Sequence, residues 1–298
     1  MNFSVVTDVL GTDSFGEALD RAQQLDFAYV DLRAKLDGSS IDTIDLKEAE
    51  ERKRQIEERS LKVSCLTSWG INPIFLFGDA KPYDRYDEAF HTRMLAGLDR
   101  LCDLADLFDT SYIRIYSLTR PDGFDLLSAD EKRVYYDHNA SILRRHADLA
   151  GRRGKTILIE NEPPSLTNCA EELGQLAGAL QHPHLKINWD IVNEWIGGRY
   201  PTVESYERVK DYAVQVHLKG AMRAPDSEGE SDPRGRFGRV GIAGQDDYDH
   251  AALLRHMLAY NSQLTLTIDT HYHALDERDQ IGELEVVRRS KQFFESVL

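Results

Sequence analysis

The sequence predicts a single-domain α/β fold, a (β/α)8 or TIM barrel, and three observations support that prediction. Eight short β-rich segments alternate with helical patterns along the chain. The length of 298 residues suits eight such strand–helix units. The segment VTDVLGTDSFGEAL, which follows the first strand, lacks the GxGxxG spacing of a phosphate-binding loop. The last observation argues against an open doubly wound sheet, which is the competing α/β architecture.

The eight predicted strands are short runs rich in β-branched and aliphatic residues. They cover residues 3–8, 28–33, 62–67, 112–117, 156–160, 185–190, 213–218 and 264–269.

The segments between the strands carry helix signals. Three of them start with a capping-box pattern, in which a side chain and a backbone N–H satisfy each other. The three pairs are Ser14 with Glu17, Ser128 with Glu131, and Asn168 with Glu171. Two further helices are predicted from apolar stripes, at 84–107 and 279–297.

Composition narrows the function classes. The formal net charge is −15, from 36 basic and 51 acidic residues, and it would repel a nucleic-acid backbone. No apolar run approaches the roughly 18–20 residues of a membrane span, and the N-terminal segment has no basic region of a signal peptide. Three widely spaced cysteines, Cys65, Cys102 and Cys169, suit reduced core thiols. We therefore expect one cytoplasmic domain, residues 1–298, that acts on a small molecule.

Two segments after predicted strands are candidates for the surroundings of a pocket. Residues 223–245 are rich in Gly, Pro and charge, and they could form a lid or a solvated excursion. Residues 68–83 contain Trp69, Phe75, Phe77 and Tyr83, which could form an apolar wall or pack in the ordinary way. In a barrel, both segments would lie on the catalytic face.

Ionisable residues occur where several predicted strands end. The segment TILIENEP runs from a buried strand directly into Glu160, although an ionised group is costly to bury unless a positive charge meets it. Alternate residues of a strand share a face, so counting in twos places Glu160, Asp190, His217 and Asp269 inside the barrel near its rim. Each residue alone is more simply explained as a helix cap or a core residue.

The four residues together suit a divalent metal ion. Three carboxylates and one imidazole match Mn²⁺, Mg²⁺ or Co²⁺, and they can also hold Zn²⁺. Without a cation, three clustered carboxylates would repel one another and raise their pKa values.

The segments ILIENEP, INWDIVN, VHLKG and TIDTH follow in order at the ends of strands five to eight. With YVDLR on the second strand, they resemble the xylose isomerase-like barrel superfamily of sugar isomerases, epimerases and dehydratases. The resemblance covers essentially the whole chain. It implies that Glu160, Asp190, His217 and Asp269 are the four ligands of one divalent ion, manganese in the epimerase branch.

The chain departs from the family pattern at several positions. Asp269 stands where the family generally has Glu, and Asn193 stands where ketose 3-epimerases have His. Gly220 replaces an Asp after Lys219, and the loop Gly241–Gly244 lacks the family's acidic residue. The extra histidines that the endonuclease branch needs for a trinuclear zinc site are also missing, which argues against DNA repair.

The leading hypothesis is an isomerase or epimerase of a sugar- or polyol-like hydroxy-ketone, in which the metal polarises the carbonyl. Glu160 or Asp269 would take the proton beside the carbonyl, the other would return it, and Lys219 would stabilise the developing oxyanion. The candidate substrate contacts are Asn193, Trp69, Arg114, Tyr116 and His271. A dehydratase of the inosose or dehydroshikimate kind, a C-glycoside-cleaving lyase and a non-catalytic metal- or partner-binding barrel are the alternatives. Similar proteins form homo-oligomers, but the sequence shows no interface.

Overall fold

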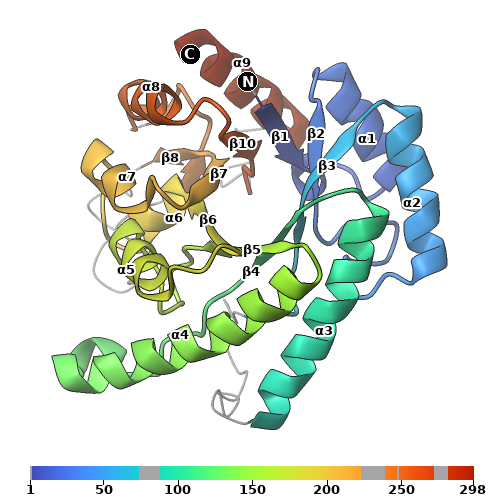
Figure 1. Cartoon of the computed structure of the whole chain (residues 1–298). Helices are drawn as coiled ribbons and strands as arrows, with labels where there is room; N and C mark the ends of the chain where they lie inside the picture. Colours follow the sequence, from blue (N-terminus) through green and yellow to red (C-terminus); the bar gives the residue numbers. More distant parts are fainter. Residues whose placement is uncertain (1, 74–87, 223–238, 247, 272–280) are drawn as a thin grey trace.

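The computed structural model describes residues 2–73, 88–222, 239–246, 248–271 and 281–298. It shows a closed barrel of parallel strands with helices around the outside (Figure 1). Neighbouring strands follow the order β1-β10-β7-β6-β5-β4-β3-β2, and β1 pairs with both β2 and β10, which closes the barrel. The predicted (β/α)8 fold is confirmed, and an open doubly wound sheet is excluded.

The barrel strands are β1 Asn2–Val6, β2 Tyr29–Leu32, β3 Lys62–Thr67, β4 Tyr112–Ile115, β5 Thr156–Glu160, β6 Leu185–Asp190, β7 Ala213–Leu218 and β10 Thr265–Ile268. The helices are α1 Phe15–Gln24, α2 Leu46–Glu58, α3 Glu88–Leu107, α4 Ala129–Arg152, α5 Ala170–Leu180, α6 Ile191–Ile196, α7 Val203–Val209, α8 His250–Tyr260 and α9 Glu283–Val297. Short 3-10 turns cover Thr7–Val9 and Phe124–Leu126.

All eight predicted strands are present, with small differences at their ends. The first strand was predicted to reach Asp8 but stops at Val6. The carboxylate of Asp8 accepts the backbone N–H groups of Ala34 and Lys35 at 3.1–3.2 Å, so this residue holds the loop after β2 and does not extend the ladder.

One of the three predicted capping boxes is complete and a second is half formed. Ser128 and Glu131 form a full capping box. Ser14 accepts a hydrogen bond from the N–H of Glu17, but the Glu17 carboxylate accepts from the hydroxyl of Thr12 and not from the N–H of Ser14. The prediction for Asn168 and Glu171 is wrong, because α5 begins one residue later with Cys169 at its N-cap. The carboxylate of Glu172 accepts a hydrogen bond from the backbone N–H of Asn168, and the carboxylate of Glu194 accepts one from the backbone N–H of Ala170. A carboxylate of the same helix and one from α6 thus replace the predicted cap.

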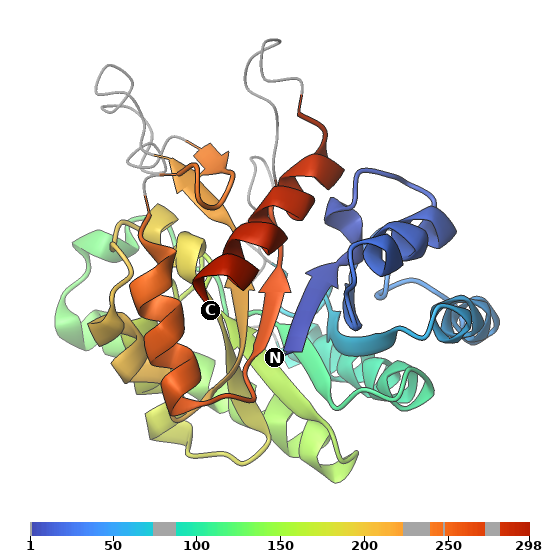
Figure 2. The same ribbon diagram turned by 90° about the horizontal axis from the view of Figure 1, so that it is seen from above.

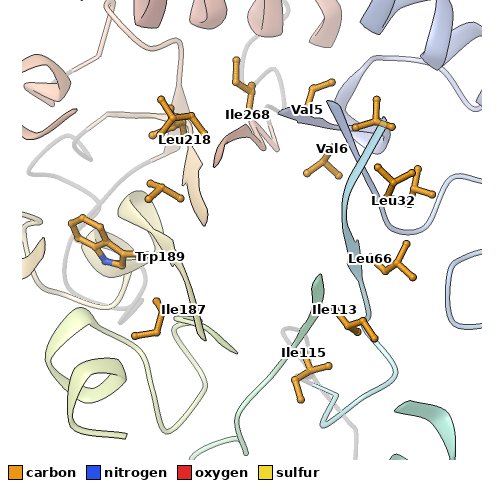
Figure 3. Close-up of a cluster of buried hydrophobic side chains, with 14 of the residues drawn as sticks. Val5, Val6, Leu32, Leu66, Ile113, Ile115, Ile187, Trp189, Leu218 and Ile268 are labelled. Carbon is orange, nitrogen blue, oxygen red and sulfur yellow. The ribbon is translucent and has the colours of Figure 1, made fainter. Parts of the chain in front are cut away.

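The two faces of each strand serve different purposes. Figure 3 shows Leu32, Leu66, Trp189 and Ile268 on the outer side of the strands, toward the helices, and all four are fully buried. The alternate residues point into the barrel and include polar groups such as Asp31 and Thr67, which hydrogen-bond each other at 2.6 Å. Figure 2 shows the strands running in one direction, so that their carboxyl ends meet at one end of the barrel.

A short antiparallel ribbon, β8 Gly220–Met222 with β9 Arg239–Gly241, lies at this end of the barrel (Figure 2). β9 falls within 223–245, the segment that could form a lid or a solvated excursion and in which no strand was predicted. The greater part of that segment, 223–238, lies outside the described residues. Phe75, Phe77 and Tyr83 also lie outside them. Cys65, Cys102 and Cys169 are free and buried, as predicted.

The contact between α5 and α7 yields a stability prediction. A Cβ atom on Gly174 would lie 2.2 Å from the carbonyl oxygen of Arg208. We expect G174A to lower the free energy of unfolding by about 1–3 kcal/mol, because backbone must shift. In the same helix a Cβ on Gly178 would meet only the hydroxyl of Tyr212, at 3.8 Å. G178A should therefore stabilise the protein by about 0.5–1 kcal/mol through helix propensity. Urea unfolding followed by circular dichroism measures the free energy of unfolding of both variants. Equal changes in G174A and G178A would contradict the close approach of Gly174 to the Arg208 carbonyl.

A buried histidine in α4 yields a pH prediction. His146 is fully buried, and burial lowers its pKa to about 4 despite the hydrogen bond of Nδ1 to the carbonyl of Ile142 at 2.8 Å. Between the unfolded pKa of about 6.5 and the folded value, the unfolded chain binds more protons, so stability falls as the pH falls. In H146N, whose amide can donate the same bond, this loss should disappear. Urea unfolding at pH 7.5 and at pH 5 measures the free energy of unfolding of both proteins. Between these pH values the wild type should lose about 2 kcal/mol more of this free energy than H146N does.

Candidate metal and active site

The carboxyl ends of β5, β6 and β7 bring three of the predicted ligands together. Glu160, Asp190 and His217 are each at most 1% exposed, and one ligand atom from each lies within 4.8 Å of the other two. Strand pairing explains this: Asp190 and His217 are register partners on neighbouring strands, and Glu160 ends the next strand. The Nδ1 atom of His217 is 3.0 Å from Oε1 of Glu160 and 3.9 Å from Oδ2 of Asp190.

Buried cations meet these carboxylates. Lys219 Nζ lies 2.6 Å from Oδ2 of Asp190, and the guanidinium of Arg114 pairs with Glu160. Arg114 is 2% exposed and also faces Glu162, with 3.8 Å between Nη2 and Oε1. These pairs offset the desolvation of the carboxylates, which would otherwise oppose their burial.

Asp269, the fourth predicted ligand, has different partners. Its two oxygens lie 3.3 and 3.2 Å from Nη1 of Arg33, and its Oδ2 lies 2.9 Å from Nε2 of His271. The same oxygen is 3.5 Å from Nδ1 of His217. Arg33 is fixed from its other side by Asp8, at 3.0 Å. The structure therefore brings Asp269 beside the other three residues, where it pairs with Arg33 and His271 and also approaches His217.

The pKa values follow from these contacts. Burial opposes ionisation of Glu160, but Arg114 and His217 outweigh it and lower the pKa to about 2. Burial also opposes ionisation of Asp269, yet Arg33 and His271 hold its pKa well below the ordinary value. For Asp190, burial prevails over Lys219 and raises the pKa. Burial and the nearby charge of Glu160 raise the pKa of Glu162 to about 8.

The donor set fits a divalent cation. Among the described residues, Oε2 of Glu160, Oδ2 of Asp190 and both ring nitrogens of His217 are buried without a well-aligned hydrogen bond, although ion pairs reach the carboxylates and Nδ1. Two carboxylates and one imidazole are ligands that Mn²⁺, Mg²⁺ and Zn²⁺ accept. Burial and Glu160 act in opposite directions on His217 and leave its pKa raised, so binding of a cation at this ring would be coupled to proton release.

The predicted substrate contacts lie around this cluster. Asn193 Oδ1 accepts a 3.4 Å hydrogen bond from Lys219, and the Arg114 guanidinium lies 4.2 Å from the centre of the Tyr116 ring. Trp69, whose side chain is about half exposed, stacks against Arg33 at 5.3 Å. The side chain of His271 is 39% exposed, and its backbone φ is +41°. A non-glycine residue in this conformation is strained, and such strain often occurs at functional sites.

The sequence reasoning gave no role to Arg33 or Glu162, both of which belong to the site. Counting in twos from Tyr29 places Asp31 and Arg33 on the inward face of β2 and its extension, so the signal that located Asp190 was also available for Arg33. Asp31 is fully buried below the site, where Thr67 and Gln215 hydrogen-bond its two oxygens at 2.6 and 2.9 Å. Burial raises the pKa of Asp31 to about 6.

No helix in the described part of the chain is both long and apolar enough to cross a membrane.

Comparison with known proteins gives the chain several relatives. A 3-dehydroshikimate dehydratase from Bacillus anthracis is 28% identical over 126 residues, which is 42% of this chain and 42% of that protein. The matched segment thus spans less than half of the relative. The crystal structure of 3-keto-D-glucoside 4-epimerase from E. coli superposes with a TM-score of 0.70 at 15% identity, covering 99% of each chain. A xylose isomerase-like barrel from Mycobacterium smegmatis, in complex with magnesium, gives a TM-score of 0.67 at 16% identity, covering 95% of this chain and 87% of that one.

At such identities the structural matches show the fold alone. The sequence model of one protein family, described as xylose isomerase-like TIM barrel, matches residues 19–296 of this chain. This match covers nearly the whole chain, including β5, β6 and β7 with the ligand-type residues at their ends. The chain therefore belongs to the xylose isomerase-like TIM barrel family.

Proposed function

We propose that this protein is a divalent-metal-dependent isomerase or epimerase acting on a sugar- or polyol-like hydroxy-ketone. The observation that carries the proposal is the convergence of Glu160, Asp190 and His217, all buried, within 4.8 Å at the carboxyl end of the barrel. This end is where TIM-barrel enzymes place their active sites. The sugar epimerase among the structural relatives supports the isomerase class.

The ion would be held by Glu160, Asp190 and His217, with Asp269 as the fourth ligand that the family pattern suggests. When bound, it would act as a Lewis acid toward the carbonyl and the adjacent hydroxyl of the substrate. We propose Mn²⁺ from the resemblance to the epimerase branch. The magnesium complex of a structural relative supports a divalent ion but does not select manganese.

The side chains around the ion suit proton transfer. The carboxylates of Glu160 and Asp269 have lowered pKa values, so both are ionised and able to accept a proton from the carbon beside the carbonyl. One would take the proton and the other would return it. Lys219, only 3% exposed and next to Asp190, would donate a hydrogen bond to the oxygen on which negative charge develops. Asn193, Trp69, Arg114, Tyr116 and His271 would contact the substrate.

A dehydratase is the second candidate, because the curated relative with 28% identity is a 3-dehydroshikimate dehydratase. The same proton abstraction would then be followed by loss of a β-hydroxyl group as water. The residues would keep their roles up to that step, so the product distinguishes the two reactions.

The proposal is tested with ketoses, inososes, 3-dehydroshikimate and oxidised glycosides, assayed with Mn²⁺ and after chelation. We expect turnover that needs the metal and a product of unchanged mass. Loss of water would establish the dehydratase, and release of an aglycone would establish a C-glycoside-cleaving lyase. E160Q should lower kcat/KM by about 10²–10⁴, the usual contribution of a general acid or base.

Glu194 provides the matched control. It is a buried carboxylate near the same end of the barrel, but its Oε2 accepts hydrogen bonds from Nε1 of Trp189 at 2.6 Å and from the N–H of Ala170 at 3.1 Å. E194Q keeps an acceptor for both and should retain activity within about twofold, since it leaves the proton-transfer groups intact. Full turnover by metal-loaded E160Q would refute the proton-transfer role of Glu160.

A further inference from the structure

We propose that Trp69 is a stacking platform for the ring of a cyclic hydroxy-ketone, and that Asp42 is the positioning residue that holds this platform at the mouth of the barrel. The inference rests on the proposed function and narrows its substrate class to a six-membered carbocyclic or pyranose ring, as opposed to an open-chain ketose.

The position of Trp69 is the first argument. The residue lies two positions beyond the end of β3, and its ring centre is 5.3 Å from the guanidinium carbon of Arg33. Arg33 is itself buried and pairs with Asp269 of the candidate site at 3.2 Å. The indole thus contacts the site, yet the residue is 48% exposed. Tryptophan is largely buried on average, so an accessible indole beside a candidate active site indicates a contact surface for a ligand.

The loop that carries Trp69 is built around one carboxylate. Oδ2 of Asp42 accepts hydrogen bonds from the backbone N–H groups of Trp69 and Gly70 at 2.8 and 3.0 Å. Oδ1 of Asp42 accepts one from the hydroxyl of Ser68 at 2.5 Å. The Ser68 oxygen in turn accepts the N–H groups of Gly70 and Ile71, both at 3.1 Å. Charge-assisted hydrogen bonds of this kind are strong, so the carboxylate fixes the backbone on both sides of the indole.

Asp42 and the loop are each tied to the barrel. Asp42 belongs to the connection between β2 and α2, and its carbonyl accepts a hydrogen bond from Arg100 of α3 at 3.2 Å. Ser68 is fully buried and donates its N–H to the carbonyl of Arg114, in β4, at 3.0 Å. A Cβ atom on Gly70 would lie 3.1 Å from the carboxyl carbon of Asp42, so the loop follows the carboxylate closely. The platform is therefore preorganised, and a ligand does not have to order it.

The shape of an indole face favours a ring. The C–H groups on one face of a six-membered polyol ring form a flat apolar patch. Stacking this patch on an aromatic face removes both from water, while the hydroxyl groups at the edge of the ring keep their hydrogen bonds. An open-chain ketose presents such a patch only after several single bonds are fixed, which costs conformational entropy.

Trp69 can report on its own occupancy. The chain has three tryptophans, and the other two, Trp189 and Trp195, are buried. Acrylamide quenching of the fluorescence of the full-length chain therefore measures mainly the accessibility of Trp69. The probes are scyllo-inosose and methyl 3-keto-β-D-glucopyranoside, which are uncharged and cyclic, and L-erythrulose, which cannot close into a five- or six-membered ring. With Mn²⁺ present, we expect the cyclic probes to protect Trp69 from quenching and L-erythrulose to leave the quenching unchanged.

Isothermal titration with the same probes measures how much the indole contributes to affinity. W69A should bind the cyclic probes at least about tenfold more weakly than the wild type. W69F keeps an aromatic face and should stay within about threefold of the wild type. Circular dichroism checks that each variant is folded.

Variants of Asp42 test its positioning role. D42A should increase the quenching of Trp69 and weaken the cyclic probes about three- to tenfold. D42N should restore both, because its amide oxygen can still accept the two backbone N–H groups. For a substrate that is turned over, D42A should raise KM and leave kcat unchanged, since stacking acts equally on ground and transition states. D45A is the matched control: Asp45 lies in the same connection, but its carboxylate caps α2 by accepting the N–H of Glu48 at 2.8 Å. D45A should change neither quenching nor affinity.

The outcomes separate this inference from the proposed function. Equal affinity of W69A and the wild type for the cyclic probes, or a wild type that binds neither of them, would overturn the platform even if metal-dependent turnover were found. An equal loss for L-erythrulose and the cyclic probes in W69A would overturn the selection of a ring. Trp69-dependent binding of the cyclic probes without metal-dependent turnover of any substrate would instead overturn the proposed function and leave the platform standing.

Discussion

The concentration of buried charge at one end of the barrel is the constraint on which the site depends. Three carboxylates there, Glu160, Asp190 and Asp269, are nearly inaccessible to solvent. Each meets a different cation, Arg114, Lys219 and Arg33 respectively. Because a buried charge without a partner is costly, these pairs make the positions of the six side chains interdependent. The polar end of the barrel is in this sense preorganised before any ligand arrives.

The closed barrel makes such an arrangement possible. Neighbouring strands fix Asp190 beside His217 by their register, and the closure between β1, β2 and β10 lets Arg33 face Asp269 from 236 residues away. Below the site, Gln215 donates hydrogen bonds to both Asp31 and Thr267, at 2.9 and 2.8 Å. The interior is thus a connected polar layer under the charged rim. The apolar side chains that stabilise the barrel lie on the outer faces of the strands, so the site and the core use different residues of the same strands.

The fold is shared with proteins of several activities at identities of 15–18%, and it therefore does not specify a reaction. The contacts of single residues at the rim carry more information. Asp269 pairs with Arg33 and His271, and its Oδ2 also lies 3.5 Å from Nδ1 of His217. Asn193 accepts a hydrogen bond from Lys219 and so belongs to the same charged network.

The sequence by itself determined the eight strands and the inward direction of Glu160, Asp190 and His217, because side-chain alternation is a local property of a strand. It also located the cap at Ser128, where all the groups involved lie within four residues. It failed at Asn168, since the carboxylates that replace the cap come from Glu172 and Glu194, and Glu194 lies in another element. The pairing of Arg33 with Asp269 could not be predicted from the sequence and depends on the tertiary structure. Distances across a closed barrel depend on the register and stagger of all its strands, which no local pattern of residues records.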